Sequence, residues 1–481
     1  MDRRARFIFK YFVLSILIAL SAISGVSAQN YNRQKIERGN RKHWRNMIDS
    51  LNLKLPDSLP SPANDPRRPN GTFQKKEGSN NWYDSTGNTY IRSAWGTWNN
   101  YDESKANPYP NLPDPLKLNA REEVQTSSEW WKYKRPEIKR NFSEEIYGKI
   151  PNNVPAVQWK VVSRKDTTIK KIPAVVKHLR GHVDNSSYPS ISVNIKLELV
   201  TPSKAKKAVP VIVHLGYILP PGIHFPKHKS KKPSWKVQLL NKGWGFAIYW
   251  PQTVQADNGA GLTKGIIGLV NKGKPRKPDQ WGALRAWAWG ADRVFDYLAS
   301  DSAVNSNEVG IEGLSRFGKE ALVTMAYDQR YAIALVGSSG KGGATLYRRD
   351  YGETIGILCS TGEYHWFDGN FLKYAGPLNA SDLRVDSHEL IAMCAPRPVF
   401  ISTGNPKVEG RWMDDKGQFM AEVAAGPVYR LLGKQGLGTK KMPPMGTALI
   451  SGDLAFRQHF GPHTVVPNWP YFIKFAQHYF K

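Results

Sequence analysis

Residues 313–319, with the sequence GLSRFGK, place a serine between two glycines, where an apolar run ends and an amphipathic run begins. This context predicts a nucleophile elbow, the sharp strand-to-helix turn that lifts a serine hydroxyl above a sheet. Glycines suit the flanks of such a turn, because side chains there would collide with neighbouring backbone. Free N–H groups at the start of the next helix favour negative charge on a tetrahedral intermediate. The segment therefore predicts attack of the Ser315 hydroxyl on a carbonyl carbon.

The glycine spacing of this segment departs from the pattern G-x-S-x-G. Phe317 stands where the second glycine is expected, and Gly318 follows one residue later. A serine at an ordinary strand-to-helix turn is the alternative interpretation.

A serine hydroxyl needs a general base. His463 is the first candidate, because it lies in a loop near the C-terminus, after the strand-like residues 447–450. Its position satisfies the order Ser, acid, His of α/β-hydrolases. His459 is the second candidate, and a solvent-exposed histidine is the alternative for either.

The acid of a triad should follow a late strand, where an ionised carboxylate fixes the imidazole tautomer and stabilises imidazolium. Residues 398–403 form an apolar run that predicts such a strand, and Glu409 lies in the loop after it. Asp414 and Asp415 compete for the same role. Each of the three acids could instead be a surface charge.

The elements that must position these side chains follow from hydrophobic patterning. Apolar runs alternate with amphipathic segments from about Leu116 onward, which predicts a mainly parallel sheet covered by helices on both faces, the α/β-hydrolase sandwich. Thr126 and Glu129 form a capping box that opens a helix through Trp130 and Trp131. We expect strands at 209–215, 244–250, 308–314, 331–336 and 398–403, and helices at 283–298 and 317–327.

Three parts of the chain are expected. Residues 1–28 have a basic start, an apolar run and small residues before Gln29, which predicts a cleaved secretory signal and a secreted or periplasmic protein. An uncleaved membrane anchor is the alternative, although the apolar run is short for a spanning helix. Residues 29–115 are polar and rich in Asn, Pro and aromatics, and Trp82, Trp95 and Trp98 suggest an extension packed on the main domain. Residues 116–481 form the predicted catalytic domain.

The formal net charge of +28 favours a polyanionic partner. No nucleic-acid-binding motif is present, and export favours an acidic polysaccharide. A solvated basic surface without a specific partner is the alternative. The two cysteines, Cys359 and Cys394, could form one bridge or stay free, and no Cys/His cluster has zinc spacing.

Beyond the elbow, several segments resemble those of glucuronoyl esterases, carbohydrate esterase family 15. The elbow itself resembles the family motif G-x-S-R-x-G-K, which is specific, and the other matches support it. The resemblance covers most of the chain from Tyr101 onward, at 101–110, 340–349, 365–367, 386–398 and 426–433.

The resemblance implies hydrolysis of the ester between 4-O-methyl-glucuronic acid of glucuronoxylan and a lignin alcohol, without metal or organic cofactor. It implies that Arg316 forms the oxyanion hole through its backbone N–H and side chain. It also implies that Lys319 binds hydroxyls of the sugar and that Trp412 lines the sugar pocket. The partner it implies is an acidic plant polysaccharide and its lignin esters, with no membrane contact after signal removal.

Two departures from the fungal members bear on the site. Leu314 and Thr464 stand where those members have a disulfide, as in bacterial relatives. Ser338 stands where fungal members place the acid, and many bacterial relatives use an acid just before the pocket tryptophan, where Glu409 lies. One competing hypothesis is a carbohydrate acetyl esterase, but the pocket of such an enzyme would lack the sugar contacts of Lys319 and Trp412. The other is a non-catalytic glycan-binding protein, which is supported only by the absence of an acid at Ser338.

Overall fold

The structure, a computed structural model, describes residues 33–54, 74–75, 81–83, 89–92, 98–118, 122–218 and 233–481. The predicted signal over residues 1–28 lies outside them. Among the helices in these ranges, none is long and apolar enough to cross a membrane.

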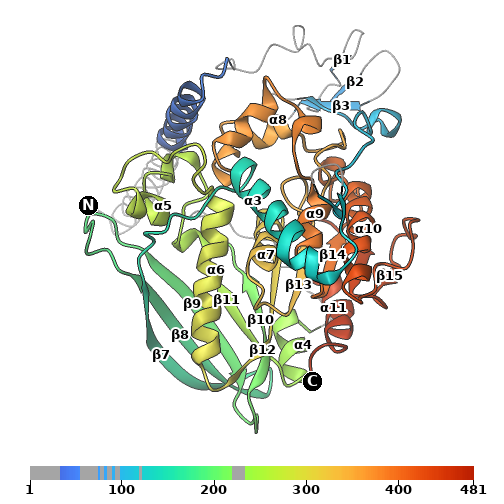
Figure 1. Cartoon of the computed structure of the whole chain (residues 1–481). Helices are drawn as coiled ribbons and strands as arrows, with labels where there is room; N and C mark the ends of the chain where they lie inside the picture. Colours follow the sequence, from blue (N-terminus) through green and yellow to red (C-terminus); the bar gives the residue numbers. More distant parts are fainter. Residues whose placement is uncertain are drawn as a thin grey trace, which may run out of the picture.

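A ten-stranded sheet runs through the molecule (Figure 1). Its central six strands are parallel, in the order β16 (Leu454–Gln458), β14 (Val399–Thr403), β13 (Ile333–Gly337), β12 (Val304–Leu314), β10 (Val209–Leu215) and β11 (Gly245–Tyr249). Antiparallel strands extend the sheet beyond β11 as β9 (Asn194–Pro202), β8 (Ile172–Val183) and β7 (Val157–Ile169), and beyond β16 as β15 (Ala448–Leu449).

The parallel strands of the sheet are buried on both faces because they carry apolar residues on both sides. In β10, Val211, Val213 and Leu215 belong to one core and Ile212 to the other. The larger core lies under α3 (Arg135–Glu145), α6 (Ala283–Ser300), α7 (Arg316–Tyr327), α9 (Ser387–Ala392) and α10 (Asp415–Leu431). The smaller lies under α4 (Trp235–Asn241) and α11 (Trp469–Ala476). This three-layer arrangement confirms the predicted α/β-hydrolase class.

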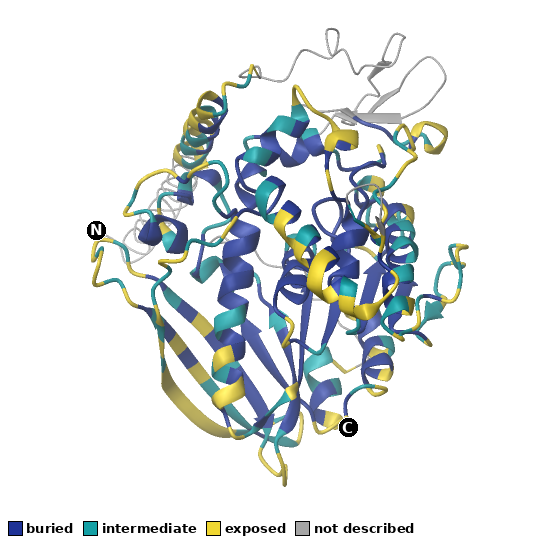
Figure 2. Cartoon of the chain, in the orientation of Figure 1, coloured by how far each residue is buried: buried dark blue, intermediate teal, exposed yellow. Residues whose placement is uncertain are grey.

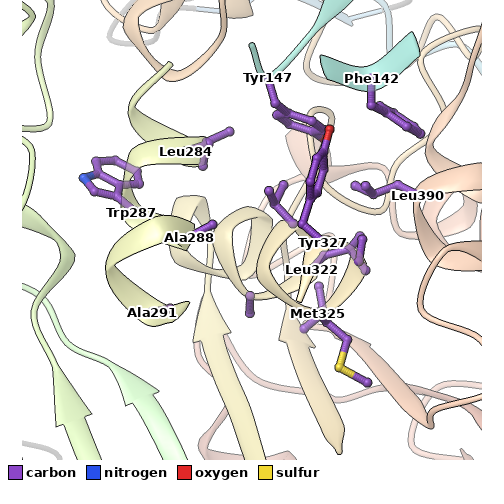
Figure 3. Close-up of a cluster of buried hydrophobic side chains, with 14 of the residues drawn as sticks. Phe142, Tyr147, Leu284, Trp287, Ala288, Ala291, Leu322, Met325, Tyr327 and Leu390 are labelled. Atoms are coloured by element: carbon purple, nitrogen blue, oxygen red, sulfur yellow. The ribbon is translucent and has the colours of Figure 1, made fainter. Parts of the chain in front are cut away.

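Helices α6 and α7 pack against each other over the strand that leads to Ser315. Figure 3 shows Ala288 and Ala291 of α6 and Leu322 and Met325 of α7 as members of one buried cluster. Both larger side chains are fully buried, and each such burial contributes about 1.5–3 kcal/mol. The contact fixes the direction of α7, and with it the residues at the start of α7.

The strands and helices predicted from the pattern are present, with shifted ends. β12 begins at Val304 rather than at residue 308, because the polar residues Asn305 and Asn307 conceal the strand's start, while Val304 pairs with Val209. Thr126 and Glu129 form the predicted capping box, and the helix continues through a π-turn at Trp130–Lys134 into α3. The remaining elements are α2 (Ser127–Glu129), α5 (Gly265–Val270), α8 (Ile355–Leu358), β5 (Lys117–Leu118) and β6 (Glu122–Glu123).

The described parts of the N-terminal region contact the larger part of the chain. A helix spans residues 33–50, and its Trp44 Nε1 donates to the Cys359 carbonyl at 2.8 Å. The Asn100 side chain donates to the Asp350 carbonyl at 2.7 Å. A small sheet contains β1 (Gln74–Lys75), β2 (Asn81–Tyr83), β3 (Thr89–Arg92) and β4 (Trp98–Asn99). The side chains of Trp82, Trp95 and Trp98 lie outside the described residues, and the domain boundary at residue 115 stays a prediction.

The two cysteines do not form a disulfide. Cys359 and Cys394 are both free and buried. The fold is therefore held by its two cores and its hydrogen bonds, as a chain of this length allows.

Candidate active site

Ser315 occupies the sharp turn between β12 and α7, with φ 61° and ψ −129°. This backbone conformation is rare for a residue with a side chain. The turn is held by the Ser315 N–H, which donates to the Gly337 carbonyl at 2.8 Å. A Cβ added at Gly313 would lie 2.1 Å from the Phe317 carbonyl oxygen, and one at Gly318 would lie 2.6 Å from the Gly337 oxygen. The backbone approaches therefore require both glycines.

The displaced second glycine has a packing reason. Phe317 is fully buried, and its ring lies 4.4 Å from that of Tyr217 and 5.4 Å from that of Trp287. Gly318, one residue later, is the position that lies against the Gly337 carbonyl at the end of β13. The elbow thus keeps its geometry with the spacing G-x-S-x-x-G.

His463 and Glu409 form a hydrogen-bonded pair in the loops that follow β16 and β14. His463 Nδ1 lies 2.5 Å from Glu409 Oε1. The other carboxylate oxygen, Oε2, accepts from the Gly404 N–H. The Glu409 side chain is fully buried, whereas that of His463 is 34% exposed. A buried carboxylate on Nδ1 leaves Nε2 of the exposed ring available to a serine hydroxyl or a leaving group.

The His463 loop adjoins the elbow through the end of β13. A Cβ added at Gly337 would lie only 2.1 Å from Val465 Cγ1, so the Val465 side chain packs against Gly337. The carbonyl of Gly337 is the acceptor for the Ser315 N–H. Loops from β12, β13, β14 and β16 therefore converge at the carboxyl ends of the parallel strands, where ligands bind in open α/β sheets.

The rival candidates have other partners. Asp414 forms a buried ion pair with Arg349, 2.9 Å from its Nε, and caps α10. Asp415 accepts from the Gln458 side chain at 2.7 Å. Both ring nitrogens of His459 meet backbone, at the Thr464 carbonyl and the Gly461 N–H. Among the described residues, none of the three forms a hydrogen bond or an ion pair with His463 or Ser315.

Arg316 is held beside the nucleophile by a cluster that sequence reasoning missed. Its Nη1 donates to Asp257 Oδ2 at 2.5 Å, and its guanidinium lies 5.0 Å from the centre of the Trp366 ring. The other oxygen of Asp257 meets His365 Nε2 at 3.0 Å and the Trp366 indole N–H at 2.7 Å. Burial opposes ionisation of Asp257, but these bonds and the Arg316 charge outweigh it and hold its pKa below the ordinary value. In the sequence, this cluster is marked by His365 and Trp366 in the segment 365–367 that resembles the family.

Lys319 is buried, with 2% of its surface exposed. Its ammonium donates to the carbonyls of Ser339 and Lys341, both at 2.7 Å, and to Glu353 Oε2 at 2.9 Å. These bonds use all three of its donors, so the predicted contact with sugar hydroxyls would require one of them to be exchanged or shared. Glu353 was not among the predicted site residues.

Glu363 carries a second buried carboxyl group beside this cluster, which the sequence did not reveal. Burial, followed by the charge of Glu353, raises its pKa to about 8, against the opposing charges of Lys319 and Arg316. Its Oε2 atom is buried and has no hydrogen-bond partner in the described structure. An unpaired buried oxygen is available to a ligand hydroxyl.

Trp412 stands between these groups and the histidine. Its ring lies 5.3 Å from that of His463, its indole N–H donates to the Glu409 carbonyl at 3.3 Å, and its own carbonyl accepts from the Glu353 N–H at 2.7 Å. Its half-buried ring therefore links the predicted acid to the carboxylates near Lys319. Ser338, the fungal acid position, is buried at the end of β13, where its N–H bonds to the Ser402 carbonyl.

In the described ranges, no set of three or more His, Cys, Asp or Glu side chains is placed so that it could hold a metal ion.

The fold and the elbow place this chain in the α/β-hydrolase class. The family model described as "Glucuronyl esterase, fungi" matches residues 275–433. A solved CE15 glucuronoyl esterase from Teredinibacter turnerae is 37% identical, with a TM-score of 0.78, over 91% of this chain and 99% of its own. "Carbohydrate esterase MZ0003", from an unknown prokaryotic organism, is 30% identical over 411 residues, 79% of this chain and 92% of that protein. A 4-O-methyl-glucuronoyl methylesterase from Wolfiporia cocos is 36% identical over 159 residues, 31% of this chain and 38% of that protein.

These similarities establish that the chain belongs to carbohydrate esterase family 15, the glucuronoyl esterases. It is a carboxylic ester hydrolase, and the predicted family is confirmed.

Proposed function

We propose that this enzyme cleaves esters of 4-O-methyl-glucuronic acid on glucuronoxylan, releasing a lignin alcohol, and that it works outside the cell after removal of residues 1–28. The proposal of ester hydrolysis rests on the hydrogen-bonded pair of His463 and Glu409 and on the elbow geometry of Ser315. The names of the Wolfiporia cocos and Teredinibacter turnerae relatives support the acid component of the ester.

The reaction begins at Ser315. Its oxygen bonds to the ester carbonyl carbon while His463 Nε2 takes the hydroxyl proton, and Glu409 stabilises the resulting imidazolium. The tetrahedral intermediate collapses with cleavage of the bond to the alcohol oxygen, which takes the proton from His463. Water then attacks the acyl-enzyme by the same route, so that the free uronic acid leaves and Ser315 regains its proton.

Arg316 stabilises the negative charge on the carbonyl oxygen. Its backbone N–H is at the first position of α7, where no intrahelical acceptor exists. Its guanidinium is fixed in advance by Asp257 and the Trp366 ring, so little reorganisation is needed when charge develops.

The sugar must be recognised through its hydroxyls, because its esterified carboxyl is neutral before reaction. Glu353 supplies an acceptor, the carboxyl group of Glu363 supplies a donor or an acceptor, and Trp412 offers an aromatic wall to the sugar face. Lys319 orients Glu353 and would reach a sugar hydroxyl by exchanging or sharing one of its three bonds. A short acyl group such as acetate would reach none of these groups.

The test is hydrolysis of benzyl glucuronate compared with an aryl acetate by the purified enzyme. We expect kcat/KM to favour the glucuronate ester. Brisk acetate release without turnover of any glucuronate ester would replace the proposal with a carbohydrate acetyl esterase, and binding of glycan without any turnover would replace it with a binding protein.

A further inference from the structure

Three cationic side chains form a row across the outer strands of the sheet. Lys160 of β7 stands opposite Arg180 of β8, and Arg180 stands opposite Lys196 of β9. Directly opposed residues of antiparallel strands project from the same face, with Cβ atoms about 4.5–5.5 Å apart. All three residues are exposed, and Figure 2 shows much of β7 exposed at the free edge of the sheet.

The row lacks the carboxylate partners that other cations of the same hairpin have. Arg164 pairs with Asp166 at 3.0 Å, and Lys177 pairs with Asp301 at 2.6 Å. In the described part of the chain, no ion pair joins Lys160, Arg180 or Lys196 to a carboxylate. The nearest acid along β9 is Glu198, whose carboxylate lies 3.1 Å from His178.

Opposed like charges destabilise a sheet. The row therefore opposes folding slightly, and no ion pair in the described part of the chain offsets this repulsion. An anionic ligand bound to the row would reduce it.

The row continues toward the nucleophile. Trp250 follows β11 beside Lys196, whose ammonium lies 4.7 Å from the centre of its ring. On the next strand, a Cβ on Gly216 would lie 3.0 Å from the Trp250 indole nitrogen. The next residue, Tyr217, donates its hydroxyl to the carbonyl of Leu314 at 2.7 Å, and Leu314 directly precedes Ser315.

The row and the predicted sugar pocket lie on opposite sides of Ser315. Lys319, Glu353 and Trp412 belong to α7 and to the loops after β13 and β14, whereas the row crosses β7, β8 and β9, with Trp250 directly after β11. Neighbouring strands are about 4.8 Å apart, so β9 lies roughly 14 Å from β12. A chain whose ester is at Ser315 can reach the row only with units beyond the one being hydrolysed.

We propose that Lys160, Arg180 and Lys196 bind the polysaccharide chain that carries the ester by meeting its free uronate carboxylates, while Trp250 holds the Lys196 ammonium beside the path to Ser315. The proposal rests on the proposed function for the identity of the chain, but binding at this surface needs no hydrolysis. Free uronates are anionic, unlike the esterified one, so the row selects acidic over neutral glycan.

The experiment compares two triple variants with the wild-type enzyme. One is Lys160→Gln/Arg180→Gln/Lys196→Gln. The control, Lys204→Gln/Lys206→Gln/Lys207→Gln, removes the same charge from exposed residues before β10, at the other end of the sheet. Binding to glucuronoxylan and to neutral xylan is measured with increasing NaCl, with the melting temperature and benzyl glucuronate hydrolysis recorded for each protein.

We expect the row variant to weaken glucuronoxylan binding by roughly fivefold to tenfold at low salt, and the difference to shrink as the Debye length falls to about 10 Å at 0.1 M salt. Its melting temperature should not fall. Benzyl glucuronate hydrolysis should be unchanged, because the small ester does not reach the row.

Equal weakening by the control variant would assign the effect to net charge and overturn the proposal. Unchanged glucuronoxylan binding by the row variant, or an equal loss for neutral xylan, would also overturn it. If the wild type hydrolyses no glucuronate ester, the proposed function fails, and the binding measurement still decides whether the row binds acidic glycan.

Discussion

His463 and Glu409 are 54 residues apart in the chain, yet His463 Nδ1 lies 2.5 Å from Glu409 Oε1. The pairing depends on β14 and β16 being parallel neighbours, since each residue lies in the loop after one of these strands. A buried acid behind a partly exposed imidazole is the arrangement that a serine nucleophile requires.

Replacing the nucleophile should abolish turnover and preserve the fold. We expect Ser315→Ala to lower kcat by roughly 10⁴-fold or more, as losses of a nucleophile do in related chemistry. Alanine meets the same backbone constraint at φ 61° as serine does, so the melting temperature should be almost unchanged. Full turnover with an unchanged melting temperature would remove Ser315 from its role.

Substitution of Glu409 should mainly affect activity, whereas substitution of Asp414 should mainly affect stability. Glu409→Gln should lower kcat by about 10³–10⁴-fold, because the imidazole loses its orienting charge. Asp414→Asn should instead lower the free energy of unfolding by about 1–3 kcal/mol, since the buried Arg349 would keep only the half-exposed Glu103 as an ionic partner. If only Asp414→Asn loses kcat in the folded enzyme, Asp414 is the acid.

Arg316 and Lys319 should affect different kinetic constants on benzyl glucuronate. Arg316→Ala should lower kcat by about 10²–10³-fold, because it removes a donor needed only when the oxyanion forms. Lys319→Ala should mainly raise KM. It should also lower the melting temperature, because Glu353 loses its ion pair. A pure KM effect of Arg316→Ala would contradict the oxyanion role.

Asp257 is expected to act through Arg316. Asp257→Asn keeps the shape but removes the charge that fixes the guanidinium, and we expect kcat to fall by roughly 10-fold to 100-fold with little change in KM. A double variant with Arg316→Ala provides the control: if Asp257 is a positioning residue, its substitution should add little once Arg316 is gone. Full additivity of the two losses would assign Asp257 a separate role.

Glu363 should make stability depend on pH. Its pKa is about 8 in the folded chain and 4.5 when unperturbed, so between these values the folded protein keeps a proton that the unfolded chain has lost. The contribution of Glu363 to stability therefore falls as pH rises from about 4.5 to about 8. The melting temperature of Glu363→Gln minus that of the wild type should therefore increase steadily as the pH rises across this interval. Parallel curves for the two proteins would refute the shift.

Much of the fold was predicted from patterning, but the three strands β7, β8 and β9 were not. β7 is exposed over most of its length, so burial restricts few of its residues, whereas β9 does carry the alternation typical of a strand with one buried face. The buried parallel strands are apolar runs between helical segments, and these were visible. A strand can be recognised from hydrophobic patterning only where burial restricts the residue types that it carries.

The sequence by itself determined the elbow, because a strand, a turn and a helix that follow one another are read within a few residues around Ser315. It also determined the candidates His463 and Glu409 by their order along the chain. Only the tertiary structure distinguished Glu409 from Asp414 and Asp415, which share one short segment. Only it brought Asp257 to Arg316 and Glu353 to Lys319. The reason is that a carboxylate's role depends on which groups lie within a few ångströms of it, and the packing of the sheet sets those distances.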